Sequence, residues 1–98
     1  MSYVTHQIDK HFTTLAYFIY KDKAQDTIAF EAVISRASAF LQTSARIASI
    51  NDNISILLAP LSILLQSATA LLAKRRRTMA QDKEIDEMIL HYFADQNV

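Results

Sequence analysis

Apolar residues recur every three to four positions in four segments of the chain. In the first segment, from about Val4 to Tyr20, this spacing places Ile8, Phe12 and Leu15 on one side of a helix. No segment alternates apolar and polar residues over the length of a β-strand. Apolar side chains at helical spacing form the buried face of an amphipathic helix. The pattern therefore predicts an all-α protein.

Two of the predicted helices are long and follow each other closely. One extends over about residues 27–50, and Asp26 or Thr27 offers a side-chain oxygen to cap its first turn. The other extends over about residues 54–77. Between them lies Asn51-Asp52-Asn53, whose short polar side chains bond to their own backbone in tight turns. Helices of equal length with a short connection predict an antiparallel hairpin.

The last predicted helix extends from Thr78 to about Phe93. The segment Thr78-Met79-Ala80-Gln81 fits a capping box, and acidic residues follow in the first turns, where the helix dipole favours negative charge. The two shorter helices flank the hairpin and predict one domain over residues 1–98. We expect a four-helix bundle, closed within the chain or completed by dimerisation. Pro60, inside the third helix, predicts a kink.

Composition narrows the possible chemistry. The 98 residues are 51% hydrophobic, which is enough to build the core of one small domain. Ten basic residues balance ten acidic residues, which argues against a sequence-independent nucleic-acid binder. The chain has no glycine, so it lacks a P-loop and a dinucleotide-binding fingerprint. It has no cysteine, which removes thiolate metal sites and cysteine nucleophiles.

Catalytic chemistry receives little support from the remaining residue types. His6 and His11 are five residues apart, which places them on different faces of a helix, and His91 pairs by spacing with Glu87. None of the many serines lies in a motif that activates a nucleophile. We therefore expect structural histidines, no metal, no cofactor and no enzymatic activity.

The two long helices are poor in charge. From Thr27 to Ala73 the chain carries only four formal charges. Helices with so little polar surface must be covered by other parts of the molecule or by a partner. This pattern favours a small non-enzymatic interaction module (an inhibitor, adaptor, chaperone or regulatory subunit) that acts on a protein partner as a homodimer. The start, Met1-Ser2-Tyr3, lacks a charged leader followed by an apolar run, so a cytoplasmic location is expected.

Two sets of residues carry this hypothesis. Those expected in the core or in a dimer seam are Phe40, Leu41, Ile47, Leu57, Leu61, Leu64 and Leu65. Those expected to face a partner are Tyr17, Tyr20, Arg36, Arg46 and the basic block of Lys74, Arg75, Arg76 and Arg77.

Two other classes of function remain open. Residues 54–73 lack a formal charge and precede the basic block, as in a single-pass or peripheral membrane protein. Ser55, Pro60 and Gln66 interrupt that apolar segment and favour a bundle helix instead. The basic block is also a possible phosphate-binding site of a nucleic-acid-binding regulator, although no second basic cluster or interleaved aromatic platform accompanies it.

Overall fold

Residues 3–96 form three α-helices, two of which lie along the first half of the third. In the computed structural model, which describes residues 3–96, α1 covers Tyr3–Tyr20, α2 covers Thr27–Ala48 and α3 covers Asp52–Gln96. A short 3-10 helix, η1, covers Lys23–Gln25 and joins α1 to α2. No strand occurs among the described residues. The predicted all-α class is confirmed.

Side-chain caps set the starts of α2 and α3. The Asp26 carboxylate accepts a hydrogen bond from the backbone N–H of Ala29 at 3.1 Å, as predicted for the cap of α2. The Asn51 side-chain oxygen accepts from the N–H groups of Asn53 and Ile54, at 3.1 and 3.4 Å. These bonds satisfy N–H groups that have no partner within the first turn of a helix. The break predicted at Asn51 therefore begins α3.

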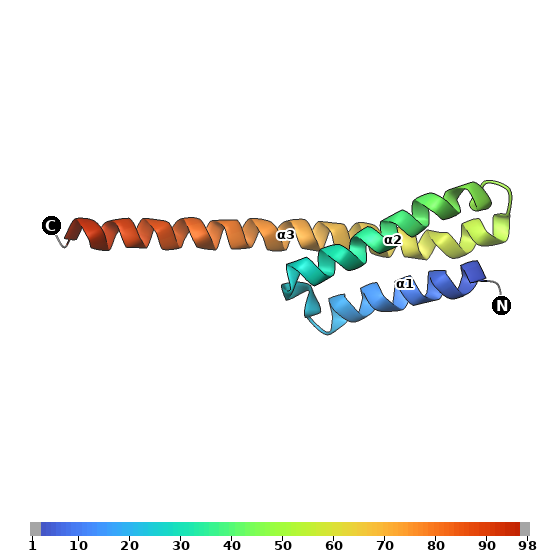
Figure 1. The fold of residues 1–98 in the computed structure, drawn as a ribbon, viewed down its shortest axis with the longest axis horizontal. Helices are drawn as coiled ribbons and strands as arrows, with labels where there is room; N and C mark the ends of the chain where they lie inside the picture. Colours follow the sequence, from blue (N-terminus) through green and yellow to red (C-terminus); the bar gives the residue numbers. More distant parts are fainter. Residues whose placement is uncertain (1–2, 97–98) are drawn as a thin grey trace.

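The fourth helix predicted from Thr78 is not a separate element, and that prediction is wrong. The chain stays helical from Asp52 to Gln96, and Figure 1 shows α3 as one long rod. The Thr78 hydroxyl donates to the carbonyl oxygen of Lys74 at 3.0 Å, which is a bond of a helix interior and not of a cap. Between Lys74 and Gln81 the residues are mostly strong helix formers with no glycine or proline, so nothing ends the helix there.

Pro60 lies inside α3 without interrupting it. The helix continues on both sides of Pro60, and the view in Figure 1 shows no sharp bend. Pro60 removes the usual N–H partner of the Ile56 carbonyl, and both residues are exposed. An unpaired backbone carbonyl costs less at an exposed position than at a buried one, because water can bind to it there.

The core joins α1, α2 and the first half of α3. Phe30, Leu15 and Leu61 are the largest fully buried side chains, one from each helix. The ring of Phe18 stacks on Phe30 with centroids 5.7 Å apart. The remaining buried apolar residues are Ile8, Ala24, Val33, Ile34, Ala37, Ile54, Leu58, Ala68 and Leu72. The last of these is Leu72, so the core ends about halfway along α3.

The second half of α3 extends beyond the bundle. Every described side chain from Arg76 to Gln96 is exposed, and the molecule measures 70 × 23 × 15 Å. Residues 78–96 are called the arm below. Figure 1 shows the arm extending past the ends of α1 and α2, so the described residues form a three-helix bundle with an arm, and a four-helix bundle closed within one chain is not seen.

Candidate interaction surfaces

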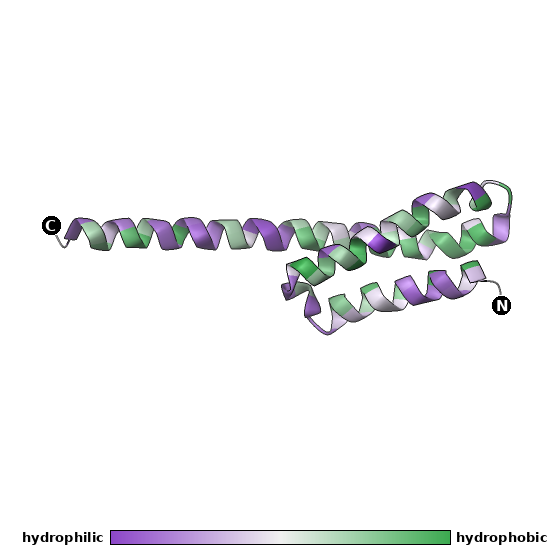
Figure 2. Cartoon of the chain, in the orientation of Figure 1, coloured by the Kyte–Doolittle hydropathy of each residue, from purple (hydrophilic) through white to green (hydrophobic). Residues whose placement is uncertain are grey.

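The arm carries an apolar stripe that no other segment of residues 3–96 buries. Ile85, Ile89 and Tyr92 follow each other at intervals of four and three residues, so they share one face of α3. Met88 and Phe93 border them, and the five side chains are 48% to 64% exposed. The rings of Tyr92 and Phe93 meet edge to face with centroids 5.6 Å apart. Figure 2 shows hydrophobic and hydrophilic residues interleaved along the arm.

The charge of the chain divides sharply between the arm and the rest. The arm carries five acidic residues and one lysine, for a net charge of −4. Residues 1–77 carry nine basic and five acidic residues, for a net charge of +4. The neutral total therefore conceals a bundle and an arm of opposite sign. Surfaces of opposite sign attract each other over about a Debye length.

The basic block lies where α3 leaves the bundle. Arg75 donates to the carboxylate of Asp22 at 2.7 Å, and Arg76 pairs with Glu31 on α2. Asp22 precedes η1 in the left-handed conformation, with φ 56°. Two of the four cationic groups in the block are therefore already paired within the chain. Lys74 and Arg77, the other two members of the block, are exposed.

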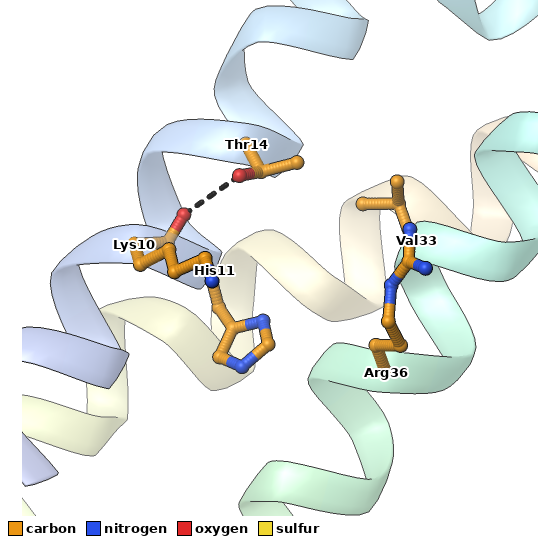
Figure 3. A pocket seen from close by; sticks show the side chains of 5 residues that line it. All are labelled: Lys10, His11, Thr14, Val33 and Arg36. Carbon is orange, nitrogen blue, oxygen red and sulfur yellow. Dashed lines mark hydrogen bonds between the residues drawn. The ribbon is translucent and has the colours of Figure 1, made fainter.

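A basic hollow lies between α1 and α2. Lys10, His11 and Thr14 line it from α1, and Val33 and Arg36 line it from α2 (Figure 3). The hollow arises because α3 packs more extensively against α1 and α2 than these two helices pack against each other.

His11 forms part of the wall of this hollow. Its imidazole ring lies against Phe40, with centroids 4.9 Å apart. Burial lowers the pKa of His11 below its ordinary value of 6.5, and the positive charges of Lys10 and Arg36 lower that pKa further. The neutral imidazole is therefore favoured, and the positive charge of the hollow comes from the lysine and the arginine.

An apolar hollow continues along the same two helices. Its lining residues are Tyr3, Val4, Ala39, Phe40, Thr43, Ser44 and Ile47. A third, more polar hollow borders it at Gln42, Thr43 and Arg46. We call the surface formed by the first two hollows the α1–α2 groove. It is basic at Lys10 and Arg36 and apolar at Phe40, and Arg46 lies near its far end.

The structure distributes the predicted interaction residues over several surfaces. Arg36 and Arg46 lie along the α1–α2 groove, whereas Tyr17 and Tyr20 are 50% and 83% exposed near the other end of α1. The basic block is separate from the groove residues in the structure. The arm was not predicted to be an interaction surface, because residues 78–93 were expected to form a separate helix of the bundle.

The residues expected in the core or in a dimer seam also differ in burial. Leu61 is fully buried. Phe40, Leu41, Leu64 and Leu65 are partly buried against the core. Ile47 and Leu57 are exposed, at 39% and 42%, so they contribute little to the core of a single chain. Ile47 lines the α1–α2 groove, and Leu57 lines a hollow between α1 and α3 together with Phe12 and Pro60.

Comparisons with known proteins add no further information on function. No family model matches the chain, and neither curated proteins nor solved structures give a significant match. Within residues 3–96, no group of three or more histidine, aspartate or glutamate side chains is arranged to hold a metal ion. The interaction surfaces are therefore the features on which a function can be argued.

Proposed function

We propose that this protein is a non-enzymatic helical interaction module that binds another protein chain through the arm of α3. The observation that carries the proposal is the exposed stripe of Ile85, Ile89 and Tyr92 on the half of α3 that no other part of the described chain covers. Contiguous exposed apolar surface on a soluble protein is typical of a binding site. Amphipathic helices bind partners through anchors at this spacing.

The arm also lacks the packing that stabilises a helix, which favours a bound partner. Most of the stability of a helix in a protein comes from packing of its apolar face, and short isolated helices are marginal in water. The arm has 19 residues and no tertiary contact to supply that packing. A bound chain would stabilise the helix and remove Ile89, Tyr92 and Phe93 from water at the same time.

Photo-cross-linking in cells tests this proposal. A photoreactive phenylalanine analogue is placed at Ile89, in the stripe, and in a matched variant at Lys83, which lies on the opposite face of the same helix. We expect protein adducts from position 89 and few from position 83. Equal yields at both positions, or no protein adduct at position 89, would overturn the proposal.

Membrane association is the second candidate function, and one observation favours it. α3 is long and apolar enough, by length and composition, to cross a membrane, and only 22% of its most apolar window is buried in the bundle. Against it, the buried side chains of Ile54, Leu61 and Ala68 pack within the bundle. Recovery of the protein only in the membrane fraction after lysis without detergent would favour the membrane candidate over the interaction module.

The nucleic-acid candidate has less support. A phosphate-binding surface depends on cationic groups that are available to neutralise phosphates. Arg75 and Arg76 already have carboxylate partners, at Asp22 and Glu31. The acidic arm follows directly after the block, and its charge would repel a nucleic acid that approached from that side.

A further inference from the structure

We infer that the chain bound by the arm is a second copy of this protein, and that each arm lies in the α1–α2 groove of the other copy. This inference rests on the proposed function and names its partner. In such a dimer each bundle of three helices gains a fourth helix from the other chain. The two-fold symmetry gives each copy one inserted arm and one filled groove. The assembly is therefore a closed dimer, to which no further copies can bind in the same way.

Charge is the first reason for choosing a second copy. The arm has a net charge of −4 and residues 1–77 have a net charge of +4. When two copies lie head to head, the acidic arm of each copy therefore meets the basic bundle of the other. In the groove itself, Lys10 and Arg36 line the hollow without an acidic residue among its lining side chains. On the arm, Asp82 and Asp86 border the apolar stripe at helical spacing.

The direction of the arm follows from where α3 leaves its own bundle. It leaves beside η1, as the bond between Arg75 and Asp22 shows. When two copies meet at these ends, each arm enters the other bundle at η1 and runs toward the apolar end of the groove. The arm is then parallel to α2 and antiparallel to α1.

Residue counting then gives the register. All α-helices rise about 1.5 Å per residue. Residues of parallel or antiparallel helices that are the same number of positions away from the η1 end of the bundle therefore lie side by side, which we call level. Taking arm residue 78 as level with Thr27, the start of α2, places Asp86 level with residue 35, next to Arg36. The same count along α1 places Asp86 within two residues of Lys10. The acidic border of the stripe thus meets the basic hollow.

The apolar parts match in the same register. Tyr92 lies level with residue 41 of α2, beside Phe40, and Phe93 lies within one residue of Val4 on α1. Both Phe40 and Val4 line the apolar hollow of the groove. With arm residue 78 taken as level with Thr27, one register therefore aligns the charges and the apolar side chains together.

A charge exchange across the contact tests the inference. Arg36→Asp in the groove or Asp86→Arg in the arm places like charges opposite each other, and each should weaken the dimer about tenfold in sedimentation velocity at low salt. The combined variant should recover the affinity of the unchanged protein. The matched control is a double variant with Ala59→Glu and Gln66→Glu. It makes the net charge more negative by the same amount as Arg36→Asp, but at exposed positions of α3.

Cross-linking tests the register directly, because the chain has no native cysteine. Under mild oxidation the variant with Ala39→Cys and Ile89→Cys should form a disulfide-linked dimer, since these positions lie within one residue of the same level. The control with Ile63→Cys and Ile89→Cys should remain largely unlinked, because Ile63 lies on the exposed side of α3.

The outcomes separate this inference from the proposed function. A protein that stays monomeric, or a dimer whose affinity the combined charge exchange does not recover, would overturn the inference. A monomer that still gives adducts with a different protein from position 89 would retain the proposed function and reject self-association. The absence of both self-association and protein adducts would reject both.

Discussion

The hydroxyl of Thr78 donates to the carbonyl oxygen of Lys74, one helical turn earlier, at 3.0 Å. A threonine that caps a helix instead accepts a bond from an N–H group that follows it. The bond to Lys74 therefore marks Thr78 as an interior residue of a continuous helix. It is this continuity that directs the acidic, apolar arm away from its own bundle.

Interrupting α3 just after Thr78 should release the arm without unfolding the bundle. Ala80→Pro removes a backbone hydrogen bond and costs about 3 kcal/mol in a helix interior. Far-ultraviolet circular dichroism of the monomer should show a clear loss of helix. The denaturation midpoint of the bundle should change little, because the last core residue is Leu72.

A proline near the end of the arm is the control for this interruption. Ala94→Pro should affect only the last turn of α3 and leave most of the helical signal intact. If Ala80→Pro left the circular dichroism unchanged, or unfolded the whole chain, the description of the arm as an unpacked extension would be wrong.

Leu61 should be among the most sensitive positions for stability. Its side chain is fully buried at the centre of the core, so Leu61→Ala should lower the free energy of unfolding by about 2–5 kcal/mol through lost packing and the cavity left behind. Urea denaturation measures the change. Ile63 is two residues away, and it is 65% exposed. Ile63→Ala should therefore change the free energy of unfolding by less than about 0.5 kcal/mol.

Stability should decrease in weak acid because of His11. Its pKa is lower in the folded protein than the ordinary value of 6.5, so below that value the unfolded chain binds more protons than the folded chain. The loss of stability therefore begins as the pH falls through about 6.5 and is complete once the pH is below the folded pKa. Thermal denaturation of the monomer at a series of pH values measures this slope.

Substitution identifies the group responsible for that slope. His11→Gln should flatten the part of the acid dependence that begins near pH 6.5, because the titrating imidazole is gone. His6→Gln, which alters an exposed histidine on the same helix, is the matched control variant. A slope that persisted in the His11 variant would assign the effect to another group.

Local chemistry made the helices themselves predictable. The spacing of Ile8, Phe12 and Leu15 predicted α1 to within about one residue at each end. Asp26 and Asn51 carry side-chain oxygens suited to capping, and both cap a helix in the structure. These features depend on neighbours within about one turn of the chain, so a pattern in the sequence reveals them.

The end of the third helix could not be predicted in the same way. The segment from Thr78 to Gln81 matches the sequence of a capping box. The same sequence also occurs inside a helix, where it caps nothing, when no residue before it ends that helix. The signal that favoured continuity was the lack of glycine and proline between Lys74 and Asp82. That signal was weaker than the change from basic to acidic residues, which suggested a boundary.

The sequence by itself determined the helical class, the Asp26 cap of α2, the apolar faces and the opposite charges of residues 74–77 and 82–87. Only the tertiary structure decided which apolar faces are covered. Ile34 and Leu61 face neighbouring helices, whereas Ile85 and Ile89 face solvent although their spacing is equally helical. Periodicity defines a face within one helix, but burial depends on whether another helix reaches that face, and a straight α3 carries the arm beyond the reach of α1 and α2.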